Sequence, residues 1–385
     1  MVAGGPYGLE DILGKAGYLR ALLMLAIIPF LWSLPTALMV GELASSIPAE
    51  GGFYVWVRRA LGPFWGFQEA WLSLAASVFD MAIYPAIFVA YLSRVAPTWT
   101  AGWRGSLWAL AVVLGCALWK WHGHGTGVLL QPIASPDLAG AISVTLWNYM
   151  GWDNASTVAQ EVDDPQRNYP RAMVGSAALV AVTYILPLLA VGLAGLDAAQ
   201  FSTGAWTDAA RILVGPALAL SVVLGGMING VGMFSPLMMS YTRLPFALAE
   251  DSLAPRAFTR LNRYGVPWAS VVFCACIWAL ALNFSFERLI SIDLVLYGAS
   301  LLLEFVALVV LRRREPALPR PFRVPGGMVG AVLAGVGPAL LIVFAMVAAR
   351  TERVLGLNAL LFAALVGLSG AVVYALLQLR HKRTS

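Results

Sequence analysis

Long apolar segments separated by short polar linkers dominate this chain. A helix that crosses a bilayer needs about 20 mainly apolar residues, whereas the strands of a membrane barrel need about ten residues of alternating character. The lengths found here are those of helices, so the pattern predicts an all-α polytopic membrane protein. Ten segments occupy residues 21–40, 64–92, 105–119, 138–160, 172–196, 212–242, 265–286, 289–311, 326–349 and 354–379, the segment 105–119 being the shortest.

Composition supports the same fold class. Hydrophobic residues make up 60% of the 385 residues and charged residues only 12%, about half the charged fraction of soluble domains. No linker is long enough for a separate soluble domain, so residues 1–385 are expected to form a single transmembrane domain. The three cysteines lie within apolar segments and suggest neither a disulfide framework nor a metal site.

The positive charges lie between the apolar segments, where they set membrane orientation rather than bind nucleic acid. From residue 138 onward the arginine clusters fall on alternate loops, which predicts one cytoplasmic side and a cytoplasmic C-terminus. Arg58 and Arg59 should share that side with Arg167 and Arg171, which requires an even number of crossings between the two pairs. Only three segments separate them, so we expect a spanning segment to be missing near residues 120–136.

Acidic residues occur in or beside the apolar segments, with almost no basic residue among them. They are Glu42, Glu69, Asp80, Asp153, Glu161, Asp293 and Glu304. An ionisable group inside the bilayer costs several kcal/mol unless it faces a cavity, pairs with a cation or carries a proton. The expected partner is therefore a cation from outside: an amine, a proton or a metal ion. Glu42 and Glu161, at segment ends, are instead expected at the membrane interface, whereas Asp80 lies in mid-segment.

Helical spacing groups some of these acids. Glu69 and Asp80 are eleven residues apart and share one helix face. A polar stripe runs along segment 289–311 through Asp293, Tyr297, Ser300 and Glu304, at positions i, i+4, i+7 and i+11. This stripe either lines a transport pathway or hydrogen-bonds to neighbouring helices.

Two segments have the character of broken helices. The first, AGGPYG at residues 3–8, contains a Gly-Gly-Pro sequence that unwinds a helix, although it could also be a loose terminus. The second, WNYMGWDN at residues 147–154, combines large aromatic and polar residues within an apolar segment, although its tryptophans could be interfacial anchors. Irregular backbone at membrane depth is tolerated where it lines a cavity, and transporters build their sites from such helices.

Several motifs resemble the amino acid–polyamine–organocation superfamily, and in particular its polyamine uptake permeases, which are relatives of the L-type amino acid transporters. They include AGGPYGLED, FWGFQEAW, DMAIYPAIFVAYL, LWNYMGWDNASTVAQEVDDPQRNYPRAM and LLLEFVALVVLRRREPALPRPFRVP. The resemblance implies a five-plus-five inverted-repeat fold and proton-coupled uptake of polyamines. It places the break of helix 1 at residues 4–6, Asp80 in helix 3, the break of helix 6 at residues 147–153, and Tyr297 and Glu304 in helix 10.

The resemblance and the polar pattern together give a candidate site. Its predicted ligand is a small cationic solute such as putrescine or spermidine, bound by Gly4, Gly5, Asp80, Trp147, Asn148, Trp152, Asp153 and Tyr297. The tryptophan rings would hold an alkyl-ammonium group by cation–π contact. Glu69, Asp80 and Glu304 are the candidates for coupling to the proton. The expected surroundings are a lipid bilayer, taken to be the plasma membrane, and no cofactor, metal or nucleic acid is expected.

The chain departs from the family pattern at two places. It begins at the break of helix 1, so the first half-helix is expected to be missing, and it lacks the fifth helix where the charge parity also fails. We therefore expect an open groove beside residues 147–153. Two alternatives remain: a permease for neutral or cationic amino acids, and a non-transporting sensor or inactive truncated permease. An enzyme has the least support, because no nucleophile–base pair or phosphate-binding loop is apparent.

Overall fold

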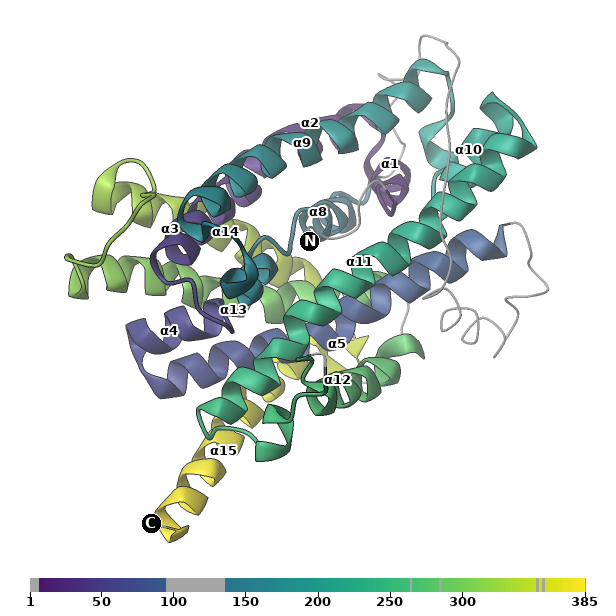
Figure 1. Cartoon of the computed structure of the whole chain (residues 1–385). Helices are drawn as coiled ribbons and strands as arrows, with labels where there is room; N and C mark the ends of the chain where they lie inside the picture. The colour runs from purple at the N-terminus through teal and green to yellow at the C-terminus, as the bar shows by residue number, and fades with distance from the viewer. Residues whose placement is uncertain are drawn as a thin grey trace.

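The computed structural model describes residues 7–94, 136–263, 265–283, 286–350, 353–354 and 357–384, and nearly all of them are helical (Figure 1). The helices are α1 (Glu10–Ala16), α2 (Tyr18–Ile28), α3 (Leu34–Ser46), α4 (Phe53–Leu61), α5 (Pro63–Ser93), α8 (Leu138–Asn148), α9 (Pro165–Leu193), α10 (Trp206–Leu213), α11 (Pro216–Glu250), α12 (Trp268–Leu280), α13 (Phe286–Arg314), α14 (Gly327–Ala349) and α15 (Ala359–Thr384). Two-residue strands β1 (Arg353–Val354) and β2 (Leu357–Asn358) form an antiparallel pair.

Shorter helical turns join or extend these helices. They are the π-helical turn η1 (Pro29–Ser33) and the 3₁₀ turns η3 (Asp153–Glu161), η4 (Ala198–Gln200), η5 (Arg256–Thr259) and η6 (Ala281–Asn283). Pro29 lacks the N–H that donates the hydrogen bond of an α-helix. The wider π-helical turn η1 begins at Pro29, and the helix continues through it. Residues 18–46 therefore form one continuous span through α2, η1 and α3.

The prediction of an all-α polytopic membrane protein is confirmed. Within the described residues, seven helical segments are long and apolar enough to cross a bilayer. They are Tyr18–Ser46, Pro63–Ser93, Pro165–Leu193, Pro216–Glu250, Arg288–Arg314, Gly327–Ala349 and Ala359–Leu379. The segment 265–286 gives the shorter helix α12, and the segment 105–119 lies outside the described residues. The five-plus-five repeat stays a prediction.

One end of the bundle carries most of the described arginines, and we call it the Arg-rich end. Ion pairs there join helices that are distant in sequence: Arg58 with Asp251, Arg59 with Glu315, Arg243 with Glu50, and Arg312 with Glu42. Arg167 and Arg171, at the start of α9, line a surface pocket together with Pro321 and Phe322 of the linker that follows α13. Both arginine pairs that the charge pattern assigned to one side thus lie at the same end.

Glu42, which the sequence places at the membrane interface, lies near the end of α3 at the Arg-rich end, and its depth in a bilayer stays a prediction. Its side chain is fully buried at the Arg-rich end, where Arg312 donates to both carboxylate oxygens and the Arg320 guanidinium lies 3.3 Å away. The backbone N–H of Val324 adds a hydrogen bond of 2.7 Å. The basic partners come from the end of α13 and the linker that follows it, so no local spacing in the sequence predicts the pair.

At the opposite end of the bundle, α1 is tied to two neighbours. Lys15 forms an ion pair with Asp137 at the start of α8, and Asp11 accepts a hydrogen bond of 2.6 Å from Thr203 in the loop before α10. Between the two ends, α5 packs lengthwise against both α11 and α13 (Figure 1). The polar faces of these three helices meet in the middle of the bundle, where the candidate site lies.

The buried ion pair at Glu42 generates a stability prediction. Glu42→Gln leaves the Arg312 and Arg320 side chains, which are 8% and 5% exposed, without their counter-charge. Breaking such a pair costs about 3–5 kcal/mol. The apparent Tm of the detergent-purified protein, followed by thermal unfolding, should therefore fall markedly.

The matched control is Glu315→Gln. Its partner Arg59 is 42% exposed, and exposed pairs contribute about 0–1 kcal/mol. That Tm should hardly move. Equal Tm losses in the two variants would contradict the assignment of Glu42 as the buried anchor of this end.

Candidate functional site

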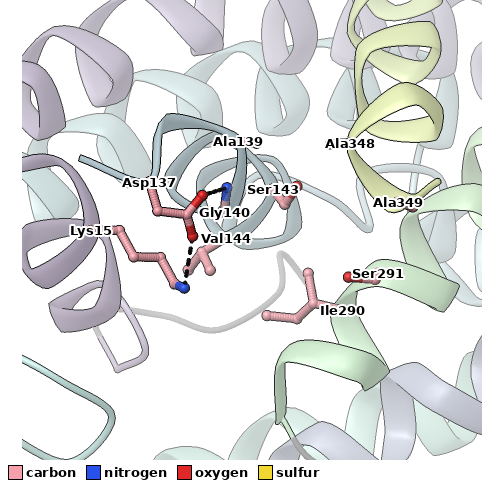
Figure 2. Close-up of a pocket in the computed structure, with 10 residues that line it drawn as sticks. All are labelled: Lys15, Asp137, Ala139, Gly140, Ser143, Val144, Ile290, Ser291, Ala348 and Ala349. Atoms are coloured by element: carbon pink, nitrogen blue, oxygen red, sulfur yellow. Dashed lines mark hydrogen bonds and ion pairs between the residues drawn. The ribbon is translucent and has the colours of Figure 1, made fainter. Parts of the chain in front are cut away.

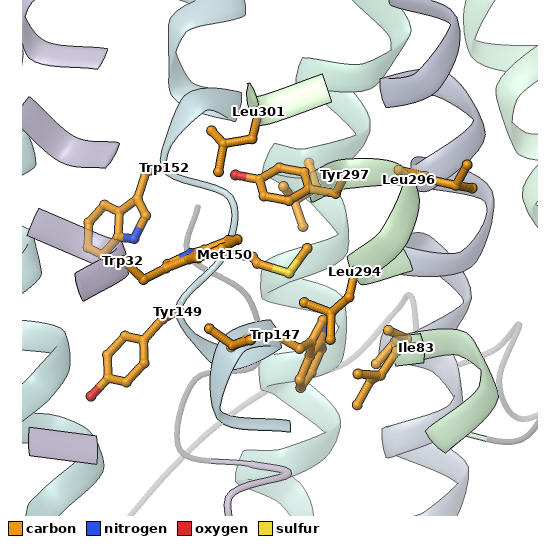
Figure 3. Packing of buried hydrophobic residues seen from close by; sticks show 14 of the residues in the cluster. Trp32, Ile83, Trp147, Tyr149, Met150, Trp152, Leu294, Leu296, Tyr297 and Leu301 are labelled. Atoms are coloured by element: carbon orange, nitrogen blue, oxygen red, sulfur yellow. The ribbon is translucent and has the colours of Figure 1, made fainter. Parts of the chain in front are cut away.

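A helix break forms the wall of the site, at the place where the sequence predicts one. Helix α8 ends at Asn148, and the 3₁₀ turn η3 begins at Asp153. Gly151 lies between them with a φ of 87°, in the left-handed region that glycine enters without a Cβ penalty. Its N–H donates to the Tyr297 hydroxyl at 3.3 Å. Figure 3 shows the aromatic side chains of Trp32, Trp147, Trp152 and Tyr297 gathered around this break.

Asp80 lies in the middle of α5 and accepts hydrogen bonds from three neutral donors. The Tyr84 hydroxyl and the Trp147 indole N–H reach Oδ1 at 3.1 and 3.4 Å, and the Tyr241 hydroxyl reaches Oδ2 at 3.1 Å. The donors come from α5 itself, from α8 and from α11, so one carboxylate joins three elements. None of these donors carries a charge, and the hydrogen bonds leave the negative charge of an ionised Asp80 uncompensated.

Two further carboxylates complete the centre. Asp153, at the start of η3, accepts a hydrogen bond from the Tyr297 hydroxyl of α13. Asp293, one helical turn before Tyr297, has no hydrogen-bond partner for either oxygen within the described part of the chain, and it interacts electrostatically with both Asp80 and Asp153. All three side chains are at most 4% exposed. Among the described residues, none of the three pairs with a lysine or an arginine.

A small cavity lies beside these groups. It has a volume of about 10 Å³ and is lined by Asp80, Tyr84, Met150, Gly151, Asn154, Leu237, Tyr241 and Tyr297. That volume holds about one water molecule. A diamine with a four-carbon chain is far larger, so the conformation is closed around its centre. The described residues show no open groove beside 147–153, because Trp147, Trp152 and Asp153 are at most 2% exposed.

A second acidic level lies nearer the Arg-rich end. The Ser73 hydroxyl lies 2.7 Å from Glu69 Oε1 on α5 and 3.0 Å from the Ser300 hydroxyl on α13. Glu304 lies within electrostatic range of Glu69. Glu69 Oε2 and both Glu304 oxygens are buried without a hydrogen-bond partner in the described residues. The polar stripe of α13 thus faces the polar face of α5 along both levels.

Asn148 and Trp152 do not line the cavity. Asn148 donates to the Val144 carbonyl at 2.9 Å inside α8, and the Trp152 indole nitrogen is buried without a hydrogen-bond partner in the described residues. Their roles in binding stay predictions. Gly4 and Gly5 lie outside the described residues. The structure therefore brings together Asp80, Trp147, Asp153 and Tyr297.

The sequence pattern missed several residues of this site. Tyr84 follows Asp80 by four positions, a spacing that could have identified it. Tyr241 and Ser240 sit on α11 and reach the site only through tertiary packing. Tyr241 accepts from the Asn154 amide at 3.3 Å, and the Ser240 hydroxyl donates to the Asn154 carbonyl at 2.9 Å. These bonds attach α11 to the start of η3.

Comparison with known proteins places this sequence in a family. Residues 1–135 and 119–371 match the sequence model of the amino acid permease family. The chain belongs to this family. The permease is 35% identical over 372 residues to the polyamine transporter PUT1 of Oryza sativa subsp. japonica. The aligned region covers 89% of this chain and 70% of the relative.

Two other relatives extend the comparison. The polyamine transporter RMV1 of Arabidopsis thaliana is 31% identical over 376 residues, covering 89% of the permease and 76% of the relative. The serine/threonine exchanger SteT of Bacillus subtilis is more distant, at 24% identity over 332 residues, 76% of the permease and 75% of SteT. The resemblance to the polyamine branch is thereby confirmed.

The geometry of the break predicts a strain effect. Gly151→Ala places a Cβ on a residue in the left-handed region and should destabilise the protein by about 1–2 kcal/mol. The control is Gly232→Ala on α11, where an added Cβ meets nothing within 4 Å. Thermal unfolding should show a lower Tm only for the Gly151 variant. A fall in Tm for Gly232→Ala as large as for Gly151→Ala would speak against the left-handed turn.

Proposed function

We propose that this permease is a secondary active transporter that takes up polyamines such as putrescine or spermidine together with protons. One observation carries the proposal: Asp80, Asp153 and Asp293 are buried together without a basic partner among the described residues. Buried carboxylates of this kind persist where a mobile cation compensates them. The names of the relatives in rice and Arabidopsis, both polyamine transporters, point to the same substrate class.

The proposed amine site is the space between Asp80, Asp153 and the Trp147 ring. An ammonium group there would replace the missing counter-charge, and an indole face contributes roughly 0.5–2 kcal/mol to holding it. The closed cavity must first expand. The break between α8 and η3 is suited to this, because its residues are not held by the hydrogen-bond ladder of a continuous helix. Binding would thus move Trp147 and Asp153 relative to α5.

The proposed proton site is the pair Glu69 and Glu304, with Asp80 as the alternative carrier. Glu69 and Glu304 have buried oxygens without a hydrogen-bond partner in the described residues, and a proton bound to one of them would relieve the repulsion between the two carboxylates. Eleven residues of α5, at about 1.5 Å each, separate Glu69 from Asp80 by about 16 Å. Ser73 and Ser300 lie between the two levels and offer hydroxyl groups for proton transfer.

The proposed orientation puts the Arg-rich end in the cytoplasm, following the preference of arginine loops for that side. The Tyr374 ring in the last part of α15 packs against Phe64 at the start of α5, with ring centroids 5.3 Å apart. The C-terminal part of α15 would then be cytoplasmic as well. The opposite end would face the outside of the plasma membrane, from which the solute enters.

Asp80→Asn tests the amine site. The amide keeps the size of the side chain and removes the charge, so labelled putrescine or spermidine should no longer accumulate in vesicles, because the ammonium loses its central counter-charge. The control is Asp197→Asn, an exposed helix cap at the surface that asparagine also satisfies. Wild-type accumulation by the Asp80 variant would remove Asp80 from the mechanism. Strong leucine uptake by the wild type, with no response to polyamines, would favour the amino acid permease.

Glu69→Gln and Glu304→Gln test the proton site. Each amide mimics the protonated acid permanently, so accumulation driven by a pH gradient should fall while exchange of labelled for unlabelled putrescine continues. Both rates are measured in the same proteoliposomes with and without the gradient. Accumulation that still follows the pH gradient in the double variant would move the proton to Asp80.

A further inference from the structure

A separate pocket opens at the end of the bundle opposite the Arg-rich end (Figure 2). It has a volume of about 190 Å³ and lies where the end of α1, the start of α8, the start of α13 and the end of α14 meet. Its walls are formed by Lys15, Asp137, Ala139, Gly140, Ser143, Val144, Ile290, Ser291, Ala348 and Ala349. The pocket is about nineteen times the volume of the central cavity and shares no residue with it.

Two residues that line this pocket, Val144 and Ile290, lie one helical turn from residues of the central site. Val144 precedes Trp147 by three residues on α8, and Ile290 precedes Asp293 by three residues on α13. Residues three apart are neighbours on a helix face, separated by about 4.5 Å along the axis. Both Asp293 oxygens are buried without a hydrogen-bond partner in the described residues.

A carboxylate and an ammonium group face each other at the pocket wall. Lys15 Nζ lies 3.0 Å from Asp137 Oδ2, and Asp137 Oδ1 caps α8 by accepting the Gly140 N–H at 2.9 Å (Figure 2). The Asp137 side chain is 52% exposed, so a cation arriving from solvent can reach it. The Lys15 side chain is 21% exposed and presents the same chemical group, a primary ammonium, that a polyamine carries.

The Asp137 carboxylate stays charged at physiological pH. Partial burial raises its pKa, but the Gly140 N–H and the Lys15 ammonium outweigh this and hold the pKa below its ordinary value. A group with a lowered pKa loses its charge only under acidic conditions, well below the pH of transport assays. Its effect on a cation is therefore constant over the pH range in which a transport proton would titrate.

We propose that this pocket is an outer binding site for the ammonium group of the transported amine, with Asp137 as its carboxylate and Lys15 as the resident cation that the amine displaces. The proposal rests on the proposed function and adds a second, peripheral site on the path to Asp293 and Asp80. Lys15 also makes binding depend on the charge of the solute. While Lys15 is paired with Asp137, it repels a solute of higher charge more strongly. Once the solute has replaced Lys15 as the partner of Asp137, the carboxylate attracts the solute of higher charge more strongly.

Substitutions at the two residues change KM in opposite directions. Asp137→Asn removes the attraction but keeps the helix cap, since asparagine caps as well as aspartate. KM should rise roughly three- to tenfold for putrescine and further for the more highly charged spermidine, as expected for removal of one nearby charge at high dielectric. Lys15→Met leaves Asp137 ionised and open, so KM should fall. The double variant should lie between the two.

Controls separate this site from the general surface charge. Asp208→Asn removes a carboxylate from an ion pair with Arg94 at the same end of the bundle and should leave KM within about twofold of the wild type, because exposed pairs are screened. The dependence of KM on solute charge should weaken between low and physiological ionic strength in the wild type and be small in the double variant.

The outcomes distinguish the two proposals. If the wild type takes up no polyamine, the proposed function fails. If the wild type takes up polyamines but Asp137→Asn and Asp208→Asn give equal KM values, the outer site is overturned. A poorly folded Asp137 variant does not block the test, because the fall in KM predicted for Lys15→Met is a gain that misfolding cannot produce. An unchanged or raised KM in Lys15→Met would overturn the proposal by itself.

Discussion

A carboxylate without a neighbouring cation is costly in the low dielectric of the bundle interior, and the rest of the architecture depends on this constraint. Asp80, Asp153 and Asp293 meet where α5, α13 and the break after α8 converge, and the surrounding elements supply neutral donors from Tyr84, Tyr241 and the Trp147 indole. Such donors orient a carboxylate without cancelling its charge. The packing of α11 against η3 and of α13 against α5 therefore surrounds uncompensated negative charge, which a mobile cation can neutralise.

The same chain solves the opposite problem at its Arg-rich end. Glu42 is as deeply buried as Asp80, yet Arg312 and Arg320 neutralise it and the Val324 N–H completes its hydrogen bonding. A paired charge of this type holds α3, α13 and the following linker together and has no capacity for a ligand. Burial alone does not separate the two kinds of carboxylate. The nature of the nearest donors does.

Sequence periodicity predicted the helices, the break near Gly151 and the polar stripe of α13, because each is set by neighbours within a few positions along the chain. It also identified Asp80 and Asp153, since an acid within an apolar segment is conspicuous. It could not find Tyr241 or the pairing of Glu42 with Arg312, because those contacts join residues far apart in sequence. For the same reason it expected a groove at the break, where the described aromatic side chains are in fact packed.

The one-water cavity at the centre has a consequence for the membrane itself. A hydrated ion needs a continuous file of water, and a void of about 10 Å³ beside Asp80 holds about one molecule of it. Within the described part of the bundle, the centre of this conformation therefore offers the ions on the two sides of the bilayer no such file.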